Sequence, residues 1–255
     1  MRKKNLLFIL FTLGMGIGLY SCNFGNSGNV SNYQSVPAVV AYDSNGNYVL
    51  GNPPFGYLYA PELNQYNYGD CVFLQQFTID FDNQPSTQYY TATNVLAEGV
   101  SQSPYEAKDT INMGETGEYK ADTLLLTDVS GIASVYYEGK FFVGLNAKDK
   151  SPTFRLIYNT EKDEADGTKN LFLIAEPSPS GGSTSAVGAI HAFDLRSLVL
   201  MGRDTTVTTT PGTASTGVDL KYIKVNLKYL SAISDTGEPT FSSVSQNPFI
   251  IYIFK

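Results

Sequence analysis

The chain has 255 residues, with 17 basic and 24 acidic side chains and a formal net charge of −7 at pH 7. An acidic surface lacks the basic patches on which nucleic-acid binding depends, so nucleic acid is excluded as a partner. One histidine and two cysteines cannot supply the several ligands of a usual zinc site, so no metal or other cofactor is expected.

The first residues have the pattern of a secretory signal. Arg2, Lys3 and Lys4 precede residues 6–19, which carry no charge. This apolar stretch is shorter than the roughly 20 residues that a membrane-spanning helix needs. A basic start, a short apolar run and a small residue before the cut predict a signal peptide over residues 1–21. Its removal takes away three basic residues and leaves a net charge of −10.

Cys22 follows this run directly. The tetrapeptide Leu19-Tyr20-Ser21-Cys22 resembles the lipobox of bacterial lipoproteins, although Tyr20 is larger than the residue usual at its place. The resemblance implies a diacylated Cys22 thiol and a mature chain that begins at Cys22. Two or three acyl chains hold a protein stably to a membrane. The alternative is a disulfide between Cys22 and Cys71; if Cys22 is acylated, Cys71 is expected to be an inert, buried thiol.

The remaining sequence predicts an all-β protein. Tyr, Phe and Thr favour strands, while Gly, Asn and Pro favour turns. Residues 22–35 are polar and predict a flexible tether. In residues 36–98, an Asn-Gly pair at 45–46 predicts a hairpin. The strand at 71–81 alternates Phe77, Ile79 and Phe81 with polar residues, as in a sheet with one wet side.

A second set of strands begins after residues 99–120, which lose the alternation and are interpreted as a linker or covering loop. A hairpin is expected to turn at Glu138-Gly139, and the strands at 153–159 and 222–230 alternate cleanly. No stretch of ten residues keeps a helical period. We therefore predict a small OB-like barrel over residues 36–110, followed by a β-sandwich over residues 121–255.

This order of parts resembles a known group. A lipobox, a first domain with a long GDCV-type strand, and a sandwich with FDLRSL (193–198) and YIKVNLKYL (222–230) are similar to the NigD-like lipoproteins of Bacteroidetes. The resemblance implies an OB-like barrel, a β-sandwich and an envelope location, and it implies no catalytic residues. Surface lipoproteins of this phylum often carry an acidic run after the cysteine. Residues 23–27 carry none, which favours the periplasmic face of the outer membrane.

Residues 52–69 are rich in tyrosine and are the candidate binding segment. Tyrosine offers a flat amphipathic face at low entropic cost, and OB-like barrels bind oligosaccharides. A glycan or peptide platform is thus one hypothesis, and ordinary strand and loop aromatics are the other. The candidate ligand-binding residues are Tyr57, Tyr59, Tyr66 and Tyr68.

Candidates for chemistry are few. His191 is three residues from Asp194 and so on the opposite face of a strand, and no G-x-S-x-G elbow is present. His191 is therefore interpreted as a partly buried strand histidine. The acids around Gly167, which are Glu161, Asp163, Glu164 and Asp166, are interpreted as a solvated charged loop in preference to a calcium turn. Sequence cannot test for the carboxylate pair of a glycosidase.

These observations predict a non-enzymatic envelope lipoprotein. It is expected to be lipid-anchored at the outer membrane, with a structural or binding role and a glycan or an envelope protein as candidate partner. The alternatives are an adhesin-type component that uses the tyrosines, and a bacteriocin-associated, immunity-like lipoprotein suggested by the family name. A hydrolase is a third class.

Overall fold

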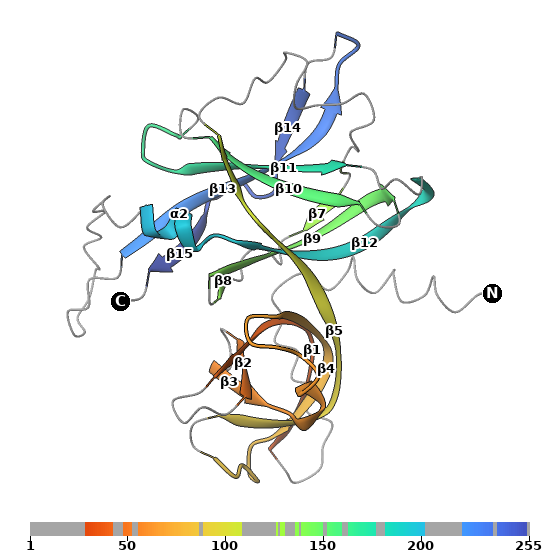
Figure 1. The fold of residues 1–255 in the computed structure, drawn as a ribbon, viewed down its shortest axis with the longest axis vertical. Helices are drawn as coiled ribbons and strands as arrows, with labels where there is room; N and C mark the ends of the chain where they lie inside the picture. Colours follow the sequence, from red (N-terminus) through yellow and green to blue (C-terminus); the bar gives the residue numbers. More distant parts are fainter. Residues whose placement is uncertain are drawn as a thin grey trace. The chain divides into compact units, whose positions relative to one another are not determined.

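The computed structural model describes residues 29–42, 48–52, 56–86, 89–108, 126, 128–130, 136–137, 139–149, 152–159, 163–176, 182–201, 221–236 and 239–253. These residues are almost entirely strands, and the predicted all-β class is confirmed. The chain divides into two compact units between Ser101 and Gln102 (Figure 1). The predicted signal peptide over residues 1–21 and Cys22 lie outside the described residues.

The first unit is a closed ring of five strands. It contains β1 (Val30–Tyr42), β2 (Tyr48–Asn52), β3 (Gly56–Tyr59), the 3-10 helix η1 (Pro61–Leu63), β4 (Cys71–Asp80) and most of β5 (Tyr90–Pro104). β1 pairs with β2 and with β4, β2 pairs with β3, and β4 pairs with β5, all antiparallel. The parallel pair of β3 and β5 closes the ring. This curled sheet is the predicted OB-like barrel (Figure 1).

One buried cluster fills the barrel. On β4 the inward residues Val72 and Leu74 are followed by Phe77 and Ile79, and the spacing of three between them coincides with register shifts against β5. The predicted alternation of Phe77 and Ile79 with polar neighbours is confirmed. Cys71 is buried at the start of β4, 2% exposed, as expected.

The predicted tether ends earlier than the sequence suggests. Of its residues 22–35, the segment 30–35 belongs to β1, and Val30 to Gln34 pair with Asp80 to Gln76 of β4. Polar side chains do not prevent a strand, because its backbone hydrogen bonds and a single apolar contact suffice. Tyr33 supplies that contact by stacking on Phe77, with ring centroids 5.2 Å apart.

The predicted linker over residues 99–120 is also wrong in its first half. β5 runs without interruption to Pro104, and β6 (Glu106–Lys108) follows. The alternation fades because most β5 side chains from Thr93 onward are exposed or half-buried, so no apolar face marks the strand. The junction between the two units therefore lies within a strand. Residues 109–120 lie outside the described part of the chain.

The second unit is a sandwich of two sheets. One contains β12 (Gly182–Asp194), β9 (Lys140–Asp149), β7 (Asp128–Ser130) and β8 (Tyr136–Tyr137), with residues 102–104 of β5 beside β12. The other has the order β14 (Pro239–Ser243), β13 (Lys221–Ile233), β11 (Lys169–Glu176), β10 (Thr153–Asn159) and β6, with β15 (Phe249–Ile253) also on β13. The predicted hairpin at Glu138-Gly139 joins β8 and β9.

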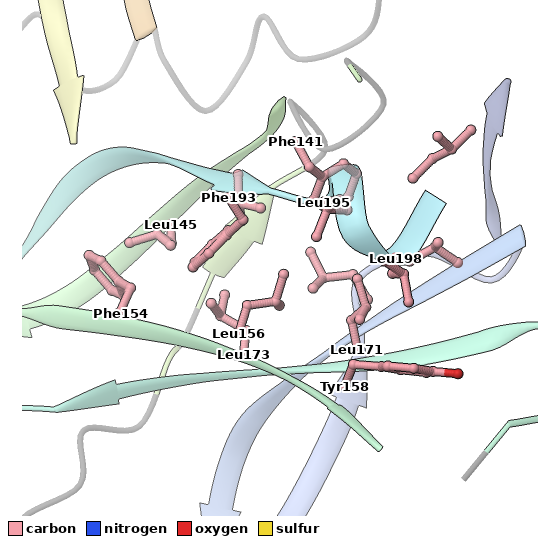
Figure 2. Packing of buried hydrophobic residues seen from close by; sticks show 14 of the residues in the cluster. Phe141, Leu145, Phe154, Leu156, Tyr158, Leu171, Leu173, Phe193, Leu195 and Leu198 are labelled. Carbon is pink, nitrogen blue, oxygen red and sulfur yellow. The ribbon is translucent and has the colours of Figure 1, made fainter. Parts of the chain in front are cut away.

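The core of this unit lies between the two sheets. Phe141 and Phe193 come from one sheet, and Leu156 and Leu173 from the other (Figure 2). The inward residues of β10 and β13 alternate as predicted. Each large apolar side chain buried in this way contributes about 1.5–3 kcal/mol. The sequence did not predict the short helix α2 (Arg196–Met201), which places Leu198 against this core.

Candidate functional site

A cleft of about 580 Å³ lies in the second unit. The end of β5, the adjoining β6, the start of β9, the end of β12 and the start of α2 all contribute to it. Its lining residues are Gln102, Ser103, Pro104, Tyr105, Ala107, Lys140, Asp194, Arg196 and Ser197. A volume of this size is in the range of small-molecule sites, roughly 300–1,000 Å³.

Asp194 is the electrostatic centre of the cleft. It ends β12 and caps α2, because its carboxylate accepts a hydrogen bond of 3.0 Å from the Arg196 backbone N–H. Lys140 Nζ donates at 3.0 Å, and the Arg196 guanidinium donates from Nε and Nη2. Burial acts to raise the pKa of Asp194, but the hydrogen bonds from Arg196 and Lys140 outweigh it and lower that pKa to about 2. Asp194 is therefore ionised at neutral pH.

The two cations of the cleft differ in exposure. The Lys140 side chain is 10% exposed, whereas that of Arg196 is 66% exposed. Their positions depend on the turn at Gly139, whose carbonyl accepts a 2.9 Å hydrogen bond from the Leu195 N–H. The Arg196 stem lies directly over Gly139, where a Cβ would come within 2.1 Å of Arg196 Cγ. Both cations thus bind the same carboxylate, that of Asp194.

His191 lies behind this cleft, on β12. Its Nε2 is 3.0 Å from the Ser103 Oγ, and its ring packs between Phe154 and Phe193 at centroid distances of 5.5 and 4.7 Å. Desolvation lowers the His191 pKa to about 4, so the ring is neutral at pH 7. The predicted strand histidine is confirmed, and it is more deeply buried than the expected partly buried side chain. The Asp194 carboxylate accepts hydrogen bonds from Lys140 and Arg196. The pair of His191 and Ser103 is therefore not extended by Asp194 into a Ser-His-Asp relay.

The acidic turn around Gly167 is neutralised by lysines. Asp163, Glu164 and Asp166 pair respectively with Lys169 at 2.6 Å, Lys228 at 3.5 Å and Lys224 at 3.0 Å. Glu161 lies outside the described residues. Within the described ranges, no group of three or more His, Cys, Asp or Glu side chains is arranged to hold a metal ion. The carboxylates thus bind lysines on β11 and β13.

The four predicted binding tyrosines occupy different environments in the first unit. Tyr57 and Tyr59 flank the buried Leu58 on β3, so they share the outer face of the barrel. Tyr66 is half-buried and packs against the core, and burial, then the nearby Glu98 and Asp70 charges, raise its pKa. Tyr68 is exposed. These placements leave the binding role of the four residues a prediction.

Tyr59 and Tyr68 make aromatic contacts with different neighbouring rings. The Tyr59 ring lies 5.6 Å from that of Tyr89, at the start of β5. Tyr68, 63% exposed, stacks on Tyr42 at 5.2 Å and 11°. Tyr42 ends β1, so these contacts link the tyrosines to different neighbours and do not assemble a single row.

The ring order of β1 to β5, closed by the parallel pair of β3 and β5, places the first unit among OB-type domains. Residues 28–97 match the family model described as the lipoprotein OB domain. The first unit is thus similar to the OB domain of lipoproteins. The resemblance to lipoproteins with an OB-like first domain is confirmed.

Solved structures extend the likeness beyond this domain. An uncharacterized protein from Parabacteroides merdae has 18% identity and a TM-score of 0.63, over 83% of this chain and 96% of its own. A candidate lipoprotein from Bacteroides fragilis has 12% identity and a TM-score of 0.51, over 88% and 96%. A NigD-like immunity protein from Bacteroides caccae has 14% identity and a TM-score of 0.45, over 86% and 93%. At these identities the likeness concerns the fold alone.

A search of curated proteins found no match to this chain. In the part of the chain that the structure describes, no helix has the length and hydropathy to cross a membrane.

The sequence does not predict the cleft residues. It indicates Asp194 only as a neighbour of His191, and it gives no sign of a role for Lys140 or Arg196. The one available signal is the Asp-Leu-Arg order at 194–196, in which a capping carboxylate precedes a short helix. The contribution of Tyr105 and Lys140 comes from strands far apart in sequence, which no local pattern encodes.

Proposed function

We propose that this protein is a lipid-anchored lipoprotein of the outer membrane, with acyl groups on Cys22 and a folded body that has a non-catalytic binding or structural role. One observation carries the proposal. The match to the lipoprotein OB domain begins at residue 28, six residues after Cys22 in the lipobox-like tetrapeptide. A lipobox-like cysteine directly before an OB-like domain is the order of the lipoproteins that this sequence resembles.

The charge of the mature chain supports attachment through lipid. With a net charge of −10, the folded body is repelled by anionic headgroups, so a charged face cannot supply the membrane affinity. Two or three acyl chains supply it instead. The absence of an acidic run in residues 23–27 supports the periplasmic face over the cell surface.

The anchor is tested on the native protein and on a Cys22→Ser variant. Detergent-phase partitioning should place the native protein in the detergent phase and the variant in the aqueous phase, because removal of the thiol removes the acyl chains. Mass spectrometry of the N-terminal peptide should show a diacylglyceryl group on Cys22. Cys71→Ala is the matched control, and it should partition as the native protein does, because Cys71 is buried in β4.

Two results count against the proposal. An unmodified Cys22 thiol, or a Cys22–Cys71 disulfide in the native protein, removes the anchor. The face is tested separately by adding protease to intact cells: protection of the native protein supports the periplasmic side, and its digestion places the protein on the cell surface.

A further inference from the structure

We propose that the cleft of the second unit binds an uncharged pyranose sugar, which packs one face on the Tyr105 ring and bonds the hydroxyls that line the cleft. This inference rests on the binding role proposed above and names a ligand class for it. It concerns residues of the second unit only, so it and the lipid on Cys22 can fail separately.

The charged groups of the cleft are occupied by one another, which argues against an ionic ligand. The Asp194 carboxylate accepts hydrogen bonds from Lys140 and from both the side chain and the backbone N–H of Arg196. Arg196 has a further interaction besides these, and the Lys140 side chain is only 10% exposed. A charged ligand would have to break one of these ion pairs, and removing the partner of a largely buried charge is costly. An uncharged ligand leaves the pairs intact.

Tyr105 lies where the chain crosses from one sheet of the sandwich to the other. It is the single residue between β5, whose end lies beside β12, and β6, which pairs with β10. The Tyr105 ring makes an edge-on contact with that of Tyr158, at a centroid distance of 6.4 Å. The next residue, Glu106, accepts hydrogen bonds of 2.7 and 2.6 Å from Arg155 Nε and Nη2. These contacts hold the Tyr105 ring in place, and a held aromatic ring offers a flat apolar surface at small entropic cost.

Three hydroxyl groups line the cleft, those of Ser103, Tyr105 and Ser197. The Tyr105 side chain is half-buried, yet its hydroxyl forms no hydrogen bond with the described residues. Burial, then the neighbouring Tyr158, raises the pKa of Tyr105, so this hydroxyl keeps its proton at neutral pH. Ser103 uses one of its three hydrogen-bonding positions on His191 Nε2, at 3.0 Å. Groups that both donate and accept match the hydroxyls of a sugar, which do the same.

A glucose-type ring combines the two features that this cleft can recognise. In its β form all the ring substituents are equatorial, so hydroxyls surround the rim and the two faces consist of C–H groups. One face can pack on the Tyr105 ring while the hydroxyls of the rim reach Ser103 and Ser197. The cleft volume of about 580 Å³ is in the range of sites that hold small molecules.

The experiment is isothermal calorimetry on the full mature protein, in a detergent without a sugar headgroup, with methyl β-D-glucoside as the probe. We expect a Kd on the order of 1 mM. Methyl β-D-glucuronide, the same ring with a carboxylate, should bind no more tightly. Sorbitol has the hydroxyls but no ring face, and it should bind at least roughly tenfold more weakly. Raising the NaCl concentration from about 50 to about 500 mM should leave the glucoside affinity unchanged, because no charge is recognised.

Variants of Tyr105 test its two contributions separately. Tyr105→Ala removes ring and hydroxyl and should weaken glucoside binding at least roughly tenfold. Tyr105→Phe keeps the ring and its contact with Tyr158, so it should fold as the native protein does and bind roughly fivefold more weakly, the effect of one hydrogen bond. Tyr68→Ala is the matched control at a tyrosine of the first unit that is 63% exposed, and its affinity should equal that of the native protein.

Several results would overturn the proposal. The first is failure of the glucoside to bind at about 20 times the expected Kd. Equal binding of sorbitol, or an unchanged affinity in both Tyr105 variants, would remove the role of the ring. Tighter binding of the glucuronide would indicate recognition of a carboxylate, and equal binding of an uncharged, end-blocked Gly-Ser-Gly peptide would indicate a peptide site. An equal loss in Tyr68→Ala would place the sugar in the first unit.

The lipid on Cys22 does not enter this test. The Cys22→Ser variant, studied without detergent, should bind the glucoside with the same Kd as the native protein. Loss of binding with an intact anchor would therefore count against the sugar site alone, and loss of the anchor with unchanged binding against the lipid alone.

Discussion

His191 shows how the surroundings of one side chain set its chemistry. Its ring lies between two phenylalanines, and its hydrogen bond to Ser103 is the polar contact that this burial leaves it. The pKa falls to about 4 from an ordinary value of 6.5. A general base works best with a pKa near the operating pH, so these contacts favour a structural role for His191.

This pKa predicts a loss of stability in acid. Between pH 6.5 and 4 the unfolded chain binds a proton at His191 that the folded chain does not bind. The contribution of His191 is therefore complete above pH 6.5 and is lost as the pH falls to 4, by up to about 3 kcal/mol. Urea unfolding at pH 7.0, 5.5 and 4.5 should show a smaller decline for His191→Gln, whose amide keeps a hydrogen bond to Ser103 but does not titrate. Identical declines in both proteins would contradict the assignment.

At the scale of elements, the turn between β8 and β9 fixes one side of the cleft. Gly139 has a φ of +81°, a conformation that disfavours side chains, and Arg196 lies over it. The Gly139 carbonyl also accepts the Leu195 N–H where β12 passes into α2. A local turn residue thus controls where a residue 57 positions later in the chain is held.

Gly139→Ala should cost more stability than the same change at Gly167. Both glycines have φ near +81°, so each alanine adds left-handed strain of about 1–2 kcal/mol. At Gly167 a Cβ would meet nothing within 4 Å, whereas at Gly139 it would meet Arg196 Cγ at 2.1 Å. Urea unfolding should therefore give a larger loss of stability for Gly139→Ala than for Gly167→Ala. Equal losses at both glycines would show that Arg196 moves aside freely.

Some strands could be predicted from the sequence, whereas others could not. On β13 Ile223, Val225 and Leu227 are buried and their neighbours half-exposed, so the period of two identifies both the strand and its inward side. On β10 Ile157 and Asn159 of the other face are buried as well, so the alternation there is weaker. β1 before Val36 and β5 after Thr93 lack a fully buried face, and their pairing rests on backbone hydrogen bonds that leave no mark on side-chain order. The cleft could not be predicted from the sequence for a related reason. Its charged residues meet only when the fold has brought β9, β12 and the end of β5 together.

At the scale of the whole molecule, the described residues form a separate main apolar core in each unit. The first centres on Phe77 in β4, and the second on residues such as Leu156 in β10. No residue belongs to both clusters, although β5 continues from one unit into the next. Separate cores imply that the stability of each unit is set mainly by its own packing.

Truncations in the two cores should therefore act on different parts of the chain. Phe77→Ala removes a side chain that is 1% exposed and Leu156→Ala one that is fully buried, at costs of about 3–5 and 2–5 kcal/mol. Hydrogen exchange read by mass spectrometry should accelerate in β1 and β4 for Phe77→Ala, and in β10 and β11 for Leu156→Ala. Leu200→Ala, at a leucine that is 52% exposed, is the control and should change neither set. If each core variant accelerated exchange equally in both sets, the two units would unfold as one, and β5 would have to transmit the coupling.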